Sequence, residues 1–304
     1  MTHDGLRVER AYAKVNLLLR ILAREASGYH GIETLFQTLA LHDLVTVRAG
    51  GADRTLDCDG PTMPAGGLGP TTHNLAWRAA EAFMRATGWD AGWSISIDKQ
   101  IPVGGGLGGG SADAAAVLRA LNALAPQPLA IGALLEIAGT LGADVPVLVL
   151  GAPLAWGWGR GDRLLVLPPL PAVPVHLVTF SDGVATAAAY GAVAAQRTAA
   201  GHGGRHGGAH AYEVAAFATW TSVAALAAND FEAVVPGLHA GVASVLPILQ
   251  AAAAEARGHG VPAIGMLSGS GATCYLLGTD LPAGTAAALT AGRVVSTATR
   301  TAPF

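Results

Sequence analysis

The chain has 304 residues, of which 51% are hydrophobic and 13% charged, so it can bury a large core and is not disordered as a whole. Its net charge of −3 and its lack of a dense basic block argue against binding to nucleic acid. No stretch offers the roughly 20 apolar residues of a membrane span, and charges occupy the region where a signal peptide is apolar. We therefore expect a cytoplasmic protein that contacts no membrane.

The first half of the chain mixes strand and helix patterns. Apolar alternation or continuous apolar runs predict extended structure or strands in four segments, 8–22, 43–49, 93–98 and 145–151. Helical patterns fall in three segments, 74–88, 111–124 and 133–142. The first of these helices carries both end signals, because Asn74 is a good N-terminal cap and Gly88 a good C-terminal one.

The second half begins with a change of composition near residue 155. Glycine and proline are frequent in 156–174, as in a linker or a set of hairpins. Further patterns predict a strand at 175–180, helices at 211–228 and 242–257, and a strand–glycine turn–strand unit at 262–278. The sequence therefore predicts an α+β fold with two lobes, 1–155 and 156–304.

Neither the histidines nor the cysteines predict a metal site. In the low-complexity segment 199–213, His202, His206 and His210 have the spacing of ligands on a helix. The glycines between them disfavour a helix, so a surface loop is the preferred interpretation. Cys58 and Cys274 match no zinc or redox spacing and are expected to be free thiols.

The segment IPVGGGLGGGSADA, residues 101–114, contains six glycines between a predicted strand and a predicted helix. Glycine lets backbone N–H groups approach a ligand, and a helix N-terminus adds free N–H groups and a positive dipole end. Together these features predict a phosphate site rather than a linker. No lysine follows as in a Walker A loop, and 123–135 lacks the acidic residue that a dinucleotide fold uses on the ribose.

This glycine segment resembles the P-x-x-x-G-L-G-[GS]-S-S-A loop of the GHMP kinases. AYAKVNLLLRIL at 11–22 and GMLSGSGATCYLL at 265–277 resemble the other two motifs of that superfamily, in the same order. GYH at 28–30 and GADVP at 142–146 resemble the corresponding segments of one branch of this superfamily. The enzymes of that branch phosphorylate a cytidine-diphosphate-linked methylerythritol for isoprenoid synthesis. Another acceptor, of mevalonate or homoserine type, and a non-catalytic nucleotide-binding protein are the alternatives.

The resemblance implies an ATP-binding, catalytic N-terminal lobe and a substrate-binding C-terminal lobe with the active site between them. It also implies phosphoryl transfer from ATP with Mg²⁺ to a small-molecule acceptor, by a monomer or weak homodimer. It assigns Asp144 as general base and Lys14 as the cation that orients it and stabilises the transferring charge. From the residues alone, a structural ion pair between these two charges is the less favoured alternative, because each lies in an apolar setting that disfavours an unpaired charge.

The same resemblance implies two sets of binding residues and leaves the protein ligands of Mg²⁺ unassigned. Those expected at the nucleotide are Asn74, Lys99, Pro102, Val103, Gly104, Gly105, Gly106, Leu107, Gly108, Gly109, Gly110, Ser111 and Ala112. Those expected at the acceptor are Asn16, Tyr29, His30, Thr186, Tyr190, Gly269, Ser270 and Gly271. Ala112 stands where the family has a second serine, so one hydroxyl contact is either missing or supplied by another residue, and Asn74 is equally a helix cap.

Overall fold

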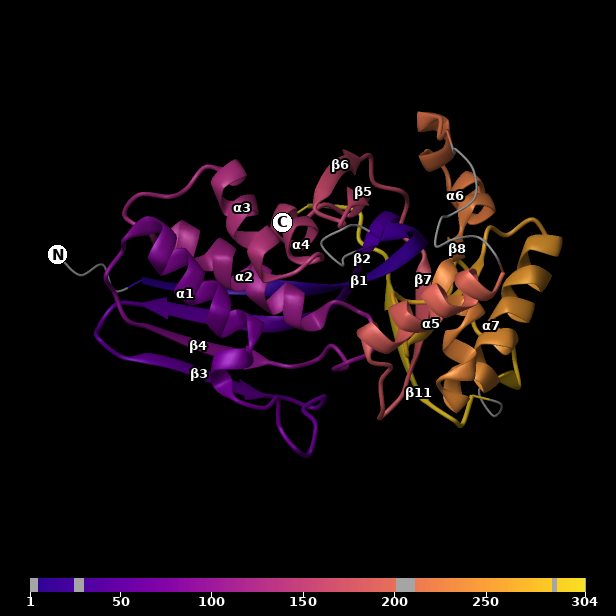
Figure 1. The fold of residues 1–304 in the computed structure, drawn as a ribbon, viewed down its shortest axis with the longest axis horizontal. Helices are drawn as coiled ribbons and strands as arrows, with labels where there is room; N and C mark the ends of the chain where they lie inside the picture. The colour runs from indigo at the N-terminus through magenta and orange to yellow at the C-terminus, as the bar shows by residue number, and fades with distance from the viewer. Residues whose placement is uncertain (1–4, 25–29, 201–210, 286–288, 304) are drawn as a thin grey trace. The chain divides into compact units, whose positions relative to one another are not determined.

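A computed structural model describes residues 5–24, 30–200, 211–285 and 289–303 (Figure 1). The chain forms two compact units, one of residues 1–13, 41–103 and 108–151 and the other of residues 14–40, 104–107 and 152–304. This division differs from the contiguous lobes that the sequence predicts, 1–155 and 156–304. The reason is that β1 (Gly5–Arg24) and β2 (His30–Ala49) are each 20 residues long and give residues to both units.

The first unit combines a small sheet with several α-helices. β3 (Arg54–Asp59) runs parallel to β4 (Trp93–Asp98), which pairs antiparallel with Leu44–Ala49 of β2. The helices are α1 (Leu75–Thr87), α2 (Gly109–Leu124), α3 (Ile131–Leu141) and α4 (Val145–Leu150), with a 3-10 turn, η1 (Thr71–His73), ahead of α1. Figure 1 shows α1 and α2 lying along β4 and β3.

Alternation along β4 explains how the first unit forms its core. Trp93, Ile95 and Ile97 are buried whereas the residues between them are exposed, as expected for a sheet with one covered face. The ring of Trp77 in α1 meets that of Trp93 edge to face, with centroids 4.6 Å apart. The buried face of the sheet therefore packs against the helices.

Two expectations for this unit have different outcomes. The ends of α1 are confirmed, since the Asn74 side chain accepts a hydrogen bond from the amide of Ala76 and Gly88 closes the helix with φ 65°. The strand expected at 145–151 is wrong, because this segment is the helix α4. A continuous apolar run fits a buried helix as well as a buried strand, and here Pro146 at the start and left-handed Gly151 at the end favour the helix.

The second unit contains strand pairs with β1 and β2 and a separate four-stranded sheet. β5 (Leu154–Gly159) and β6 (Arg163–Leu167) form a hairpin, and β5 pairs antiparallel with Ile32–Gln37 of β2. The short β8 (Ala228–Asn229) runs parallel to β1 at Leu18 and Leu19. The antiparallel sheet has the order β11 (Arg293–Ala298), β7 (Pro174–Thr179), β10 (Cys274–Leu277) and β9 (Ile264–Leu267).

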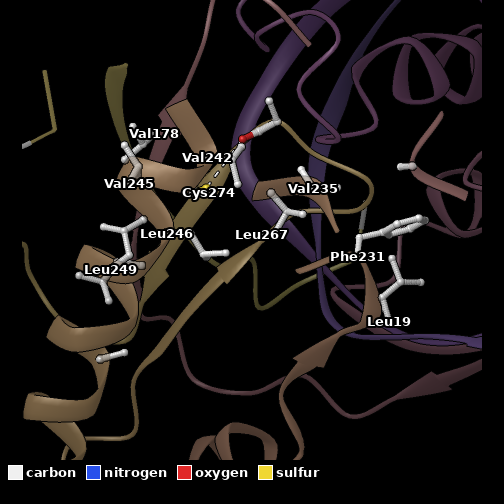
Figure 2. Close-up of a cluster of buried hydrophobic side chains, with 14 of the residues drawn as sticks. Leu19, Val178, Phe231, Val235, Val242, Val245, Leu246, Leu249, Leu267 and Cys274 are labelled. Carbon is white, nitrogen blue, oxygen red and sulfur yellow. Dashed lines mark hydrogen bonds between the residues drawn. The ribbon is translucent and has the colours of Figure 1, made fainter. Parts of the chain in front are cut away.

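Helix α7 (Ala240–Gly258) packs against this four-stranded sheet through apolar side chains (Figure 2). Val242, Val245 and Leu249 of the helix are buried in the same cluster as Leu267 and Cys274 of the strands. Gly265 in β9 permits the close approach, since a Cβ there would lie 2.8 Å from the backbone nitrogen of Gln250. Backbone contact at that point leaves no space for any larger residue.

The other described helices of the second unit lie between these strands in the chain. They are α5 (Thr186–Ala199), η2 (Val214–Phe217), α6 (Trp220–Leu226), η3 (Asp230–Ala233) and η4 (Val235–Gly237). The helix expected over 211–228 is therefore broken, because Thr219 forms a capping box with Ser222 that starts a new helix. The hairpin in 156–174, the strand at 175–180, the helix at 242–257 and the strand pair in 262–278 are confirmed within a few residues.

Three further observations bear on the sequence expectations. His202, His206, His210 and Tyr29 lie outside the described residues. Cys58 and Cys274 are both free thiols, as expected. No helix in the described ranges has the length and apolar character needed to cross a membrane.

Candidate functional site

Part of the glycine segment, residues 104–107, is fixed within the second unit from two directions. The hydroxyl of Ser268 donates a hydrogen bond of 2.9 Å to the carbonyl of Gly106. The amide of Lys14 donates one of 2.9 Å to the carbonyl of Leu107. The N-terminal strand and the turn between β9 and β10 thus both contact the glycine segment, which brings residues from all three superfamily motifs together.

Gly106 is a position where only glycine fits. Its φ of +75° is a backbone conformation that side chains disfavour. A Cβ there would overlap the carbonyl oxygen of Ser268 and lie 3.1 Å from that of Gly271. The glycine is therefore required both by the backbone angle and by the close approach of the turn.

We expect Gly106→Ala to destabilise the chain by about 1–3 kcal/mol, the cost of holding a side chain in such a conformation. Gly110→Ala is the matched control, because a Cβ there meets only Leu75, at 3.8 Å, and lies inside α2, where alanine is favoured. Thermal denaturation of both variants measures the difference. Equal melting temperatures for the two variants would contradict the assigned contact.

Lys14 and Asn16 lie side by side on β1, because residues two apart in a strand face the same side. Lys14 is only 4% exposed, and its Nζ donates a 2.8 Å hydrogen bond to Oδ1 of Asn16. The amide nitrogen of Asn16 in turn donates to the hydroxyl of Thr34, at 2.7 Å. A Cβ on Gly269 would lie 3.5 Å from Lys14 Nζ, so the buried amine faces the glycine turn.

The residues expected at the acceptor form two further contacts within the second unit. The hydroxyls of Thr186 and Ser270 are 3.1 Å apart. The rings of His30 and Tyr190 stack, with centroids 4.9 Å apart and planes 18° apart. A third ring does not fit between them at this separation.

Asn229 is a residue of this site that sequence reasoning missed. Its side-chain nitrogen donates to the carbonyls of Leu267 and Gly269, at 2.9 and 2.8 Å, and it is only 6% exposed. It therefore holds the start of the glycine turn. The only signal is a polar Asn–Asp pair after an alanine-rich helix, which by itself predicts no more than a helix end.

In the first unit the glycine segment continues into α2. Gly108 caps this helix with φ 72°, and the helix starts at Gly109. The first amides of a helix have no partner inside it, so the N-terminus offers donors to an anion. Ser111 is half-buried, whereas Ala112 is fully buried and supplies no hydroxyl.

Lys99 is buried between two carboxylates of the first unit. Its Nζ donates to Oδ2 of Asp113 in α2, at 2.6 Å, and to Oδ2 of Asp43 in β2. The other oxygen of Asp43 accepts from the amides of Gln100 and Ile101, at 2.6 and 2.7 Å. This cluster therefore ties together the end of β4, before the glycine segment, and α2, after it.

Burial controls the ionisation of this cluster. It raises the pKa of Asp113 to about 7, against the opposing charge of Lys99, and Oδ1 of Asp113 has no hydrogen-bond partner among the described residues. Burial alone would lower the pKa of Lys99, but the charges of Asp113 and Asp43 raise it above its ordinary value. Lys99 thus pairs with Asp43 and Asp113 in the fold. The expected contact of Lys99 with the nucleotide stays a prediction.

Asp144 and Asn74, also in the first unit, occupy helix starts. Asp144 is half-buried at the residue before α4. Asn74 caps α1, and its Nδ2 lies 3.9 Å from Sγ of Cys58. Lys14 belongs to the second unit and Asp144 to the first, so their pairing stays a prediction.

Comparison with known proteins shows which family this chain resembles. The family model of the GHMP kinases N terminal domain matches residues 74–152. A 4-diphosphocytidyl-2-C-methyl-D-erythritol kinase of Moorella thermoacetica is 44% identical over 180 residues, 59% of this chain and 61% of the relative. The match thus spans about three fifths of that relative's length. The kinase of the same name from Solibacter usitatus is 37% identical over 274 residues, 89% of this chain and 81% of the relative.

Solved structures agree with these relatives. The crystal structure of a 4-(cytidine 5'-diphospho)-2C-methyl-D-erythritol kinase has a TM-score of 0.69 and 33% identity, and the match covers 96% of this chain and 99% of that one. An L. major mevalonate kinase in complex with R-mevalonate has a TM-score of 0.65 at 13% identity, over 100% and 98% of the two chains, which shows the shared α+β fold alone. The chain belongs to the 4-diphosphocytidyl-2-C-methyl-D-erythritol kinase family of the GHMP kinases.

Proposed function

We propose that this chain transfers the γ-phosphoryl group of ATP to the 2-hydroxyl of 4-(cytidine 5'-diphospho)-2-C-methyl-D-erythritol. The observation that carries the proposal is the contact of the glycine segment with the Ser268 turn and with the Lys14 strand, in a chain whose relatives at 36–44% identity share this kinase name. Mevalonate and homoserine kinases match at 10–18% identity, which supports only their fold, so those acceptors are less favoured.

The glycine segment and the start of α2 supply the ATP-phosphate contacts in this proposal. Backbone N–H groups at a helix start bind phosphate oxygens without any lysine. Magnesium bound to ATP supplies neutralisation of the phosphate charge. No three His, Cys, Asp or Glu side chains gather as a metal site in the described part of the chain. The half-buried Ser111 hydroxyl is a hard oxygen donor that suits Mg²⁺ when phosphates provide its other ligands.

Asp144 and Lys14 carry the chemical step in this proposal. The acceptor oxygen forms a bond to the γ-phosphorus while the bond from that phosphorus to the bridging oxygen of ADP breaks. The hydroxyl proton passes to the Asp144 carboxylate, and the Lys14 ammonium stabilises the charge on the transferring group. Support for this role of Lys14 comes from its burial at the glycine turn, where a cation would act in a low dielectric.

The cytosine end of the acceptor is assigned to His30 and Tyr190. Their stacked rings offer one continuous aromatic surface, and His30 has ring nitrogens that can hydrogen-bond a base edge. Tyr190 is in turn braced edge to face by Phe231, with centroids 4.9 Å apart. We assign the base to an outer face of this stack or to the edge of His30, because the space between the two rings is too narrow.

His30→Ala should raise the KM for the cytidylyl acceptor about tenfold or more while leaving the KM for ATP nearly unchanged, because one charge-neutral hydrogen bond and one ring contact are lost. His259→Ala, at the exposed end of α7, is the control. Steady-state kinetics with each substrate varied in turn measures both constants. Equal effects of His30→Ala on the two KM values would count against cytosine recognition.

The proposed reaction itself is tested by incubating the purified chain with ATP, Mg²⁺ and one acceptor at a time. The acceptors are 4-(cytidine 5'-diphospho)-2-C-methyl-D-erythritol, mevalonate and homoserine, and ³¹P NMR identifies the product. We expect a new phosphomonoester signal with the cytidylyl acceptor alone. Phosphorylation of mevalonate or homoserine in its place would overturn the proposal.

A further inference from the structure

The second unit contains a cavity of about 590 Å³ that includes none of the residues assigned above to ATP or the acceptor. It lies among α6, η3, α7 and β9, and this volume is in the range of small-molecule sites. Most of the residues that line it are small or apolar, among them the alanines of α6 and most of the segment 260–266. Four polar side chains interrupt that wall, namely Thr221, Glu232, Gln250 and Arg257.

Glu232 presents a carboxylate that has hydrogen bonds but no cation. Its Oε1 accepts from the amide of Leu267 at 2.8 Å, and its Oε2 accepts from Nε2 of Gln250 at 3.1 Å. It makes no ion pair with any of the described residues. Burial accordingly raises the pKa of Glu232 to about 7, although both hydrogen bonds act to lower it. A ligand cation would supply the charge that this side chain lacks.

Arg257 provides the opposite charge at the same cavity. Its Nη1 donates a 2.6 Å hydrogen bond to the carbonyl of Ala263, which fixes the guanidinium. Within the described ranges it, too, has no ion pair. A guanidinium has five N–H donors, so several stay available for a carboxylate or phosphate. Two fixed side chains of opposite charge thus line one cavity without pairing with each other.

We propose that this cavity binds a small zwitterion, with its ammonium group on Glu232, its carboxylate on Arg257 and a short apolar chain between them. Both charges are already positioned by backbone contacts, so little side-chain entropy is lost on binding. The small and apolar residues of the wall suit a hydrocarbon chain between the two charges. Because the amide of Leu267 bonds to Glu232 and Leu267 precedes Ser268, Glu232 also contacts the strand end that leads into the glycine turn.

The test uses the full chain and a series of ω-amino acids from glycine to 8-aminooctanoate, titrated by calorimetry and by ¹³C NMR of the glutamate carboxyls. We expect one chain length to bind best and to lower the pKa of Glu232 from about 7, because the ammonium group stabilises the carboxylate. Glu232→Gln and Arg257→Met should each weaken that binding about tenfold or more, since each removes a charge-assisted contact.

Glu255→Gln is the matched control, because Glu255 is exposed on α7, the helix that carries Arg257, and does not line the cavity. It should bind the best amino acid as the unaltered chain does. Should Glu232→Gln fail to fold, Arg257→Met decides, since Arg257 lies at the exposed end of α7. Absence of binding across the series, equal binding of a plain alkylamine or alkyl carboxylate, or binding that survives both substitutions would each overturn the proposal.

Discussion

Lys99→Met is expected to lower the free energy of unfolding by about 3–5 kcal/mol, because it leaves Asp43 and Asp113 buried without their cation. Methionine retains the apolar stem, so the loss reports the charge rather than a cavity. Lys99, Asp43 and Asp113 are each at most 3% exposed, so solvent cannot screen their charges. Urea denaturation followed by circular dichroism measures the change.

A triple variant, Lys99→Met with Asp43→Asn and Asp113→Asn, separates charge imbalance from positioning. It removes every charge of the cluster, so we expect it to recover most of the stability that Lys99→Met loses. The Asp43→Asn side chain would be neutral but would still offer an oxygen to the amides of Gln100 and Ile101. Lys99→Met with the stability of the unaltered chain would contradict the described ion pairs.

The same variants report on the glycine segment. Lys99 links the strand end before this segment to the helix after it, and neither asparagine restores that link. We therefore expect the triple variant to be stable yet to bind ADP more weakly, by about tenfold, in a calorimetric titration. ADP affinity equal to that of the unaltered chain would show that the cluster supports the fold and has no influence on the phosphate site.

Local signals in the sequence were enough to predict several elements. Asn74 and Gly88 mark the ends of α1 because each acts on its own neighbours, and the alternation of 93–98 follows directly from burial of one strand face. The segment 145–151 could not be resolved in this way. A run buried on every side has no periodicity, so its sequence pattern fits a buried strand and a buried helix equally well.

In the candidate site, too, local contacts could be predicted from the sequence and long-range contacts could not. Lys14 and Asn16 could be expected to lie together, because residues two apart share a strand face. The partners of Lys99 could not, since Asp43 is 56 residues away and meets it only through strand pairing. The stacking of His30 on Tyr190 likewise depends on how a strand and a distant helix pack. Resemblance to a family identified Lys14, Asn16, Lys99, His30 and Tyr190, but only tertiary structure shows what each of them touches.

Asp144→Asn and Lys14→Met are expected to lower kcat by about 10²–10⁴ and 10²–10³ respectively, the usual contributions of a general base and of one charge that stabilises a transition state. Binding of ADP and of the cytidylyl acceptor should survive, because neither substitution removes a backbone contact of the glycine segment. Asp162→Asn, in the β5–β6 hairpin, is the control. Near-normal turnover in either of the first two variants would refute its assigned role.

The double variant then tests whether the two residues act as one unit. Groups that work together in a single step give strongly non-additive losses, so the double variant should be about as slow as the slower single variant. Independent roles would instead multiply the two losses. Because Lys14 and Asp144 belong to different compact units, this kinetic cycle reports their partnership during turnover. A fully multiplicative result would leave Lys14 at the glycine turn and Asp144 before α4 without a common function.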